Sequence, residues 1–281
     1  MSGILYVVAT PIGNLEDVTL RALRVLRDVA LIAAEDTRRT GRLLQHYSIS
    51  TPATSLHEHN EHRKSAHLIG RLQAGDSIAL VADAGTPLVS DPGARLVTLA
   101  HEAGIRVEPV PGPSAMMAAL SVAGFDSALV HFAGFPPTKG TARTEWFGRA
   151  GQLSGVLVLY EAPHRIRDTL SDLLTELGDQ PTAVARELTK AHEELVVRPI
   201  SAHLKELREP RGEYTVVVNL ADRRPETPDI PDDSALLAEF SLMTETQAGN
   251  RRHLIKLLAG KYGTTAKDIY DRLERAKHSV D

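Results

Sequence analysis

The sequence of 281 residues contains no cysteine, which excludes disulfides, thiolate metal sites and a cysteine nucleophile. This absence fits a reducing compartment. The formal net charge of −4 gives no overall basic character, so a nucleic-acid partner would have to meet a local patch. No apolar run approaches the ~20 residues that span a bilayer, and the short run Ile4–Ala9 follows no basic segment. We therefore expect a cytoplasmic protein with no membrane partner.

Several common site motifs are also missing. No G-x-G occurs, which removes the dinucleotide fingerprint, and neither the G-x-x-x-x-G-K-[ST] phosphate loop nor the G-x-S-x-G nucleophile elbow is present. The run "HEHNEH" at 57–62 is not the H-E-x-x-H zinc motif, because its fifth residue is Glu61. A two-histidine site there would lack an identifiable third ligand, so we expect no metal.

The first 123 residues alternate short apolar runs with amphipathic segments, a pattern typical of a parallel, doubly wound α/β sheet. The expected strands are Ile4–Ala9, Leu31–Ala34, Thr54–Leu56, Ser77–Ala82 and Arg106–Val110. The expected helices are Thr19–Ala30, Thr37–His46, Glu61–Ala74, Ala94–Ala103 and Ala115–Ala123.

After Gly124 the strands follow one another more closely, which favours antiparallel pairing in a second α/β domain. Strands are expected at Leu129–Phe132, Val156–Tyr160, Thr182–Leu188, Glu194–Val197 and Tyr214–Leu220, and helices at Thr141–Arg149 and Pro163–Leu177. A proline-rich polar stretch then reads as a linker. The predicted domains are residues 1–112, residues 113–222, a linker at 223–233 and a small helical appendage at 234–281.

Three expected strands end in the same kind of loop. The segments "VVATPIGNLEDVTLRAL" (7–23), "VADAGTPLVSDPG" (81–93) and "VPGPSAMMA" (110–118) each pass from a buried strand through a Gly/Pro turn into a helix. Ligands of open parallel sheets bind beyond the carboxyl ends of the strands, where Gly permits close backbone approach and Pro limits motion. Unless these are ordinary turns, such loops suit a neutral or zwitterionic small molecule better than a polyphosphate.

The first loop resembles a motif of the tetrapyrrole-methylase superfamily of S-adenosylmethionine enzymes, G-x-G-P-G-D followed by L-T-L-R-A. Here Gly13 and the T-L-R-A remain, whereas Ala9 and Pro11 replace the earlier glycines, a departure that argues against tetrapyrrole binding. The segments "TPIGNLEDVTLRAL", "AAEDTRRTGRLLQHY", "SLHEHNE", "DAGTPLVSDPG", "PGPSA", "YEAPHR" and "RELTK" together resemble one branch, the ribosomal RNA small subunit methyltransferase I family.

That resemblance implies two α/β domains of the tetrapyrrole-methylase type with a C-terminal helical appendage, and S-adenosylmethionine as cofactor. It implies methylation of the ribose 2′-hydroxyl of a cytidine in the decoding region of 16S rRNA, with 16S rRNA or the small ribosomal subunit as partner, by a homodimer. The implied cofactor-binding residues are Ile12, Asp83, Gly85, Thr86, Pro87, Leu88, Ser114, Ala115, Tyr160, Arg186, Glu213 and Tyr214.

A ribose hydroxyl is a poor nucleophile until its proton leaves, so a positioned base would assist methyl transfer, although alignment supplies much of the rate. Asp36, Glu187 and Lys190 are the candidates, each following an expected strand. A lysine base needs a lowered pKa. Alternatively, Glu187 and Lys190 form an ion pair and Asp36 caps a helix.

RNA contact requires cations, although basic clusters are usually just solvated faces. The candidates near the expected cleft and on the appendage are Arg38, Arg39, Arg42, Lys139, Arg143, Arg251, Arg252 and Lys256. Two other functions remain open: a related methyltransferase acting on a tetrapyrrole-like small molecule or a protein side chain, and a non-catalytic RNA- or ribosome-binding protein.

Overall fold

The computed structural model describes residues 2–126, 128–221, 223, 230–246 and 251–278. The chain forms two compact units, residues 1–223 and residues 224–281. In the described part of the chain, no helix is both long and apolar enough to cross a membrane.

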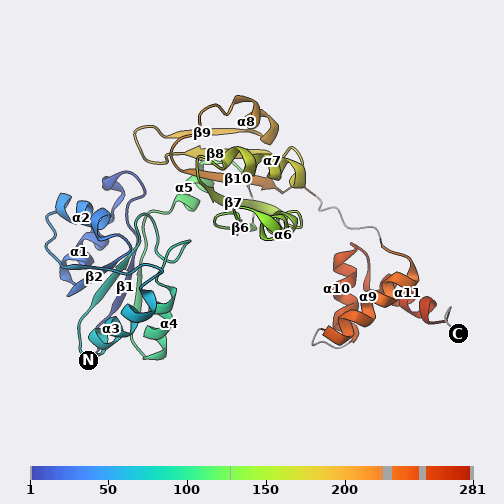
Figure 1. Cartoon of the computed structure of the whole chain (residues 1–281), viewed down its shortest axis with the longest axis horizontal. Coiled ribbons are helices and arrows are strands. Elements are labelled where there is room, and N and C mark those ends of the chain that lie inside the picture. The colour runs from blue at the N-terminus through green and yellow to red at the C-terminus, as the bar shows by residue number, and fades with distance from the viewer. Residues whose placement is uncertain (1, 127, 222, 224–229, 247–250, 279–281) are drawn as a thin grey trace. The chain divides into compact units, whose positions relative to one another are not determined.

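The first sheet of the larger unit is wholly parallel, with strand order β3-β2-β4-β1-β5. Figure 1 labels β1 and β2 of this sheet together with helices α1 to α4. Its strands are β1 (Leu5–Val8), β2 (Leu31–Ala34), β3 (Ala53–Ser55), β4 (Ile78–Val81) and β5 (Val107–Val110). The connecting helices are η1 (Leu15–Asp17), α1 (Leu20–Asp28), α2 (Thr37–His46), α3 (Glu61–Gln73) and α4 (Ala94–Glu102). The sequence alternation therefore correctly predicts a doubly wound sheet.

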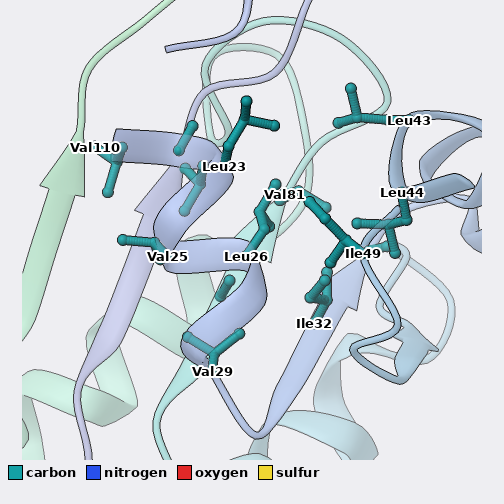
Figure 2. Packing of buried hydrophobic residues seen from close by; sticks show 14 residues of the cluster. Leu23, Val25, Leu26, Val29, Ile32, Leu43, Leu44, Ile49, Val81 and Val110 are labelled. Carbon is teal, nitrogen blue, oxygen red and sulfur yellow. The ribbon is translucent and has the colours of Figure 1, made fainter. Parts of the chain in front are cut away.

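Helices cover both faces of this sheet, because alternate residues of its central strands point in opposite directions. Ile32 and Val81 pack under α1 and α2 with Leu26, as Figure 2 shows. Their neighbours Leu31 and Leu80 belong to the opposite cluster, under α3 and α4. Burial on both faces fixes the register of each strand, and so fixes where each strand ends.

The second sheet has strand order β6-β7-β10-β8-β9 and is antiparallel except for the β6–β7 pair. Its strands are β6 (Val130–Phe132), β7 (Gly155–Glu161), β8 (Pro181–Arg186), β9 (Glu194–Pro199) and β10 (Tyr214–Leu220). The helices of this part are α5 (Ala115–Val122), α6 (Gly140–Ala150), α7 (Ile166–Leu177) and α8 (Ile200–Glu206). The expected antiparallel pairing is confirmed.

Helix α5 follows the first sheet in sequence but packs on the second, where Ala119 and Ala123 join a cluster with Val156, Val158 and Val217. The expected division near residue 112 stays a prediction, and this packing supports it. The smaller unit contains α9 (Asp233–Thr246), α10 (Arg251–Lys261) and α11 (Ala266–His278), packed around Leu254, Leu258 and Leu273. Of the expected linker, residues 224–229 lie outside the described residues.

Two local expectations are wrong. The strand expected at Thr182–Leu188 ends at Arg186, because Glu187 and Thr189 have φ of 51° and 65°, which no extended strand accommodates. Helix α8 was not expected; it has seven residues and begins directly after β9, too short for a clear helical period.

Candidate functional site

The three Gly/Pro loops meet at the carboxyl ends of β1, β4 and β5. Thr10 and Gly85 exchange two backbone hydrogen bonds of 2.9 Å, which join the first loop to the second. The Thr86 hydroxyl donates to the carbonyl of Pro113 at 3.2 Å, which joins the second loop to the third. Gly85 has φ of 79°, in the left-handed region that favours glycine.

The second loop is strained beyond its glycine. Leu88 and Ser90 have φ of 71° and 69°, which costs of order 1–3 kcal/mol at a non-glycine residue. The carboxylate of Glu61 fixes the end of this loop by accepting hydrogen bonds from the backbone nitrogens of Gly93 (3.1 Å) and Arg95 (3.0 Å). Strain held in place in this way is common at ligand sites.

A cavity of about 300 Å³ lies against these loops and is closed by residues of the second sheet. Its size and its mainly apolar lining are those of a small-molecule site. The lining comprises Ile12, Ala84, Gly85, Thr86, Val89, Ser90, Asp91, Ser114, Ala115, Phe135, Tyr160, Glu161, Ala162, Pro163, Leu188, Lys190, Glu213, Tyr214 and Thr215.

Most of the residues expected to bind cofactor line this cavity: Ile12, Gly85, Thr86, Ser114, Ala115, Tyr160, Glu213 and Tyr214. The lining does not include Asp83, Pro87, Leu88 or Arg186. Asp83 faces the neighbouring strand end, and Leu88 packs against the core cluster under α3 and α4. Arg186 pairs with Glu194 at 3.0 Å and lines a different hollow of the second sheet.

Sequence reasoning missed Asp91 and Glu161 as lining residues. Asp91 lies within "VADAGTPLVSDPG" and Glu161 within "YEAPHR", so the motifs were found but these side chains were not. Glu161 is 1% exposed and is satisfied by Thr169 (2.5 Å), the backbone nitrogen of Ala162 (2.8 Å) and Arg165 (3.3 Å).

Tyr160 lies where the second sheet meets the third loop. Its hydroxyl accepts a hydrogen bond from the backbone nitrogen of Met116 at 3.1 Å, and its ring contacts Phe132 and Phe135 edge-on or tilted. Burial raises the pKa of this phenol above its usual value. Tyr160 therefore stays neutral and holds the start of α5 against β7.

Lys190 lies between two carboxylates at the ends of β8 and β10. Its ammonium is 2.9 Å from both Glu187 Oε1 and Glu213 Oε2. Partial burial would lower the pKa of Lys190, but the hydrogen bonds to Glu187 and Glu213 raise it. The hydrogen bond from Lys190 lowers the pKa of Glu187. The lowered pKa that a lysine base needs is therefore absent.

The first loop contacts this cluster closely. Asn14 donates its backbone N–H to the hydroxyl of Thr189 at 3.0 Å, and a Cβ on Gly13 would lie 2.5 Å from Lys190 Cγ. Gly13 is therefore required for close approach between the two halves of the larger unit.

Asp36 lies outside the cavity lining and caps α2 by accepting the Arg38 backbone N–H at 2.8 Å. Hydrogen bonds from the Arg38 side chain and backbone lower the pKa of Asp36 well below its usual value. Asp36 therefore acts as the helix cap that the sequence offered as its alternative role. A direct chemical role for Asp36, Glu187 or Lys190 stays a prediction.

The candidate RNA-binding cations differ in availability. Arg38 pairs with Asp36, Arg39 with Asp83 and Arg251 with Glu274, although most of the Arg38 side chain is exposed. The side chain of Arg143 is 14% exposed and pairs with Asp172, which leaves little of it for RNA. The exposed remainder is Arg42, Lys139, Arg252 and Lys256.

The segment "HEHNEH" at 57–62 is held by hydrogen bonds. His57 donates its backbone N–H to Asn60 Oδ1 at 3.0 Å, and Glu61 holds the second loop. Among the described residues, no three His, Asp or Glu side chains are arranged to hold a metal ion.

Comparison with known proteins decides the family. Residues 4–203 match the family model described as tetrapyrrole (corrin/porphyrin) methylases. A Synechocystis protein named ribosomal RNA small subunit methyltransferase I is 45% identical over 88% of this chain and 86% of its own length. The chain belongs to the ribosomal RNA small subunit methyltransferase I family, a branch of the tetrapyrrole methylases. A relative of the same name from Pseudomonas aeruginosa is 48% identical over 77% of this chain and 79% of its own.

Solved structures share the fold. A diphthine synthase covers 77% of this chain and 90% of its own with a TM-score of 0.62 at 14% identity. A uroporphyrin-III C-methyltransferase from Thermus thermophilus, solved as a complex with S-adenosylhomocysteine, covers 79% of this chain and 99% of its own with a TM-score of 0.55 at 18% identity. The predicted fold class is thus confirmed.

The ion pairs of Lys190 with Glu187 and Glu213 should make substitutions at Lys190 and Glu187 energetically coupled. Lys190→Met should lower the melting temperature at pH 7, because Glu187 and Glu213 then lose their shared cation. Glu187→Gln in the same chain should recover part of that loss, giving a coupling of about 0.5–3 kcal/mol in a double-mutant cycle of urea unfolding. Additive effects of the two substitutions would contradict the arrangement.

Proposed function

We propose that the protein is an S-adenosylmethionine-dependent methyltransferase that methylates the ribose 2′-hydroxyl of a cytidine in the decoding region of 16S rRNA. The observation that supports this most is the cavity. It is formed by the family motifs themselves, in a chain 45–48% identical to relatives named for methylation of small-subunit rRNA.

The cavity residues fit S-adenosylmethionine. The cofactor combines a zwitterionic methionine, a flat adenine and a sulfonium cation, and it bears no phosphate. The loops offer backbone groups and small side chains at Gly85, Thr86, Ser114 and Ala115, which suit the neutral and zwitterionic parts.

When bound, the sulfonium supplies an electrophilic methyl group. The chain's own contribution is alignment: the Thr10–Gly85 pairing, the strained second loop and the Tyr160–Met116 hydrogen bond hold the walls of the cavity rigid. Such prior ordering of the reacting groups supplies a large share of the rate in a displacement reaction. Lys190, held protonated between Glu187 and Glu213, fixes the cavity wall at the ends of β8 and β10.

The partner is proposed to be 16S rRNA, free or within the small ribosomal subunit, in the cytoplasm. Exposed Arg42 and Lys139 on the larger unit and Arg252 and Lys256 on the smaller unit are the cations available for phosphate contacts. A homodimer is supported by the apolar residues that α5 leaves exposed, Met117 and Val122, each 53% exposed.

The direct test is methyl transfer from radiolabelled S-adenosylmethionine. Free 16S rRNA and small ribosomal subunits, both from cells lacking this enzyme, should be offered in parallel with uroporphyrinogen and with a protein acceptor. We expect label on RNA alone, lost when 2′-deoxycytidine replaces the target nucleotide. Methylation of the deoxy substrate, or of the tetrapyrrole or protein in place of RNA, would contradict the proposal. Absence of S-adenosylmethionine binding would favour a non-catalytic RNA-binding protein.

The cavity placement generates a second prediction. Gly85→Val should reduce S-adenosylmethionine affinity at least tenfold in calorimetric titration, because a β-branched residue at φ of 79° strains the loop. Gly148→Val is the matched control, since a Cβ there meets nothing within 4 Å. Thermal melting should verify that both variants are folded. Unchanged affinity in folded Gly85→Val would place the cofactor elsewhere.

A further inference from the structure

Asp91 is a cavity carboxylate that none of the contacts described so far engages. It follows the strained Ser90 and lines the cavity beside Thr86 and Tyr160. Unlike the other two carboxylates of the lining, it has no partner: Glu161 is bound by Thr169, and Glu213 by Lys190. Within the described part of the chain, no hydrogen bond or ion pair reaches the Asp91 side chain.

The neighbouring acidic groups are engaged, in contrast. Asp83 accepts the backbone N–H of Asp36 at 2.9 Å and lies 3.5 Å from the Arg39 guanidinium. Glu35 accepts the backbone N–H of Asp83 at 3.3 Å. These bonds engage the two acidic groups that act electrostatically on Asp91, and they leave Asp91 as the acidic group that is free to meet a ligand in the cavity.

The surroundings of Asp91 oppose its ionisation. Burial first, and then the charges of Glu35 and Asp83, raise its pKa to about 7. Tyr160, on the second sheet, faces it as a neutral phenol, and the cation nearest to Glu35 and Asp83 is Arg39. Lys190 is the cation of the cavity lining and is already neutralised by Glu187 and Glu213. A base works best when its pKa lies near the working pH, which an ordinary aspartate does not achieve.

We propose that Asp91 is the general base that removes the proton from the acceptor hydroxyl. This inference rests on the proposed function. In the step, the O–H bond breaks and its proton passes to the Asp91 carboxylate. The oxygen forms a bond to the methyl carbon, and the carbon–sulfur bond breaks with its electron pair left on sulfur. The proton then leaves Asp91 for solvent.

The sequence candidates fit this role less well. Asp36 lies outside the cavity lining and is held by Arg38, and Lys190 is held protonated. Glu187 is absent from the lining and is held by Lys190, which stabilises its charged form and weakens it as a base. Asp91 alone among these groups combines a place in the lining with an unpartnered carboxylate.

The kinetic test compares Asp91→Asn with wild type in single turnover, with RNA and cofactor both saturating. We expect a fall of about 10²–10⁴-fold, the usual cost of losing general-base help. The affinities for S-adenosylmethionine and S-adenosylhomocysteine, measured by calorimetry, should change less than about threefold, since a group needed in the transition state is not needed for ground-state binding. The matched control is Asp168→Asn, an exposed aspartate at the start of α7, which should keep the wild-type rate.

The pH dependence gives a sharper signature. The wild-type single-turnover rate should rise with pH and reach a plateau as Asp91 ionises. Asp91→Asn should lose this rising limb of the pH–rate profile. Glu35→Gln should shift the limb to lower pH with the plateau kept, because it removes a neighbouring negative charge while an amide oxygen can still accept the Asp83 N–H. A merely structural role for Asp91 would not move the limb in this direction.

A third readout needs no activity. Because the folded-state pKa of Asp91 lies above its unfolded value, ionisation costs stability increasingly as pH rises from about 4 to about 7. Asp91→Asn should therefore raise the melting temperature of the cofactor-free protein, and by more at pH 8 than at pH 5. An equal or opposite effect at the two pH values would mean that Asp91 is not the isolated, buried carboxyl that the inference requires.

These experiments distinguish a failure of the Asp91 role from a failure of the proposed function. Wild type that transfers methyl to rRNA while Asp91→Asn stays within tenfold of it would overturn this inference alone. A loss confined to cofactor affinity, with a normal rate at saturation, would make Asp91 a cofactor-binding residue and would also overturn it. Wild type that binds cofactor but methylates no RNA would overturn the proposed function and this inference together.

Discussion

The pairing of Thr10 with Gly85 is the constraint on which the site depends. Two backbone hydrogen bonds bind the loop after β1 to the loop after β4, across strands that are neighbours in the sheet. Because strand register is fixed by burial on both faces, the loops reach this pairing without adjustment. From there, Thr86 fixes the third loop through Pro113, and Gly13 lets Lys190 of the second half approach. One contact between main chains thus positions groups far apart in sequence.

The charges around the cavity divide into two groups with opposite properties. At the ends of β8 and β10, one ammonium lies between two carboxylates; their hydrogen bonds raise the pKa of Lys190, and Lys190 lowers the pKa of Glu187. At the ends of β2 and β4, the negative charges of Glu35 and Asp83 have Arg39 close by, and they still raise the pKa of half-buried Asp91. The first arrangement supplies fixed charge, whereas the second supplies a group that can change its protonation.

The fold could be predicted well from the sequence because it rests on local signals. Helix α2 has its expected bounds, Thr37–His46, since Asp36 supplies a cap and the apolar residues recur at helical spacing. The loop that the sequence singled out lines a cavity, because Gly85 and Thr86 lie at a strand end, where a parallel sheet binds ligands. Its role in cofactor binding stays a prediction. The directions of the side chains were harder to predict, because Leu88 turns toward the core at φ of 71° and Arg186 points to another hollow.

The base could not be found from the sequence because its distinguishing property is not local. Asp36, Glu187 and Lys190 each follow a strand, as a catalytic residue often does, yet each is held by a partner close in sequence: Asp36 by Arg38, and Glu187 and Lys190 by one another. Asp91 reads as one more loop aspartate before a proline and a glycine. What sets it apart is burial beside Glu35 and Asp83, residues about 56 and 8 positions earlier, and the lack of any partner within the described residues.

The central claim is that the cavity between the three loops and the second sheet binds S-adenosylmethionine and presents its methyl group to an rRNA hydroxyl. A crystal structure of the protein with S-adenosylhomocysteine tests this most directly. We expect density for the whole ligand against Gly85, Thr86 and Ala115, with its sulfur facing the side of the cavity that holds Asp91. Density for the ligand at any other site would contradict this assignment. So would a ligand whose sulfur points away from Asp91 and is closed off from solvent, where no RNA hydroxyl could reach it.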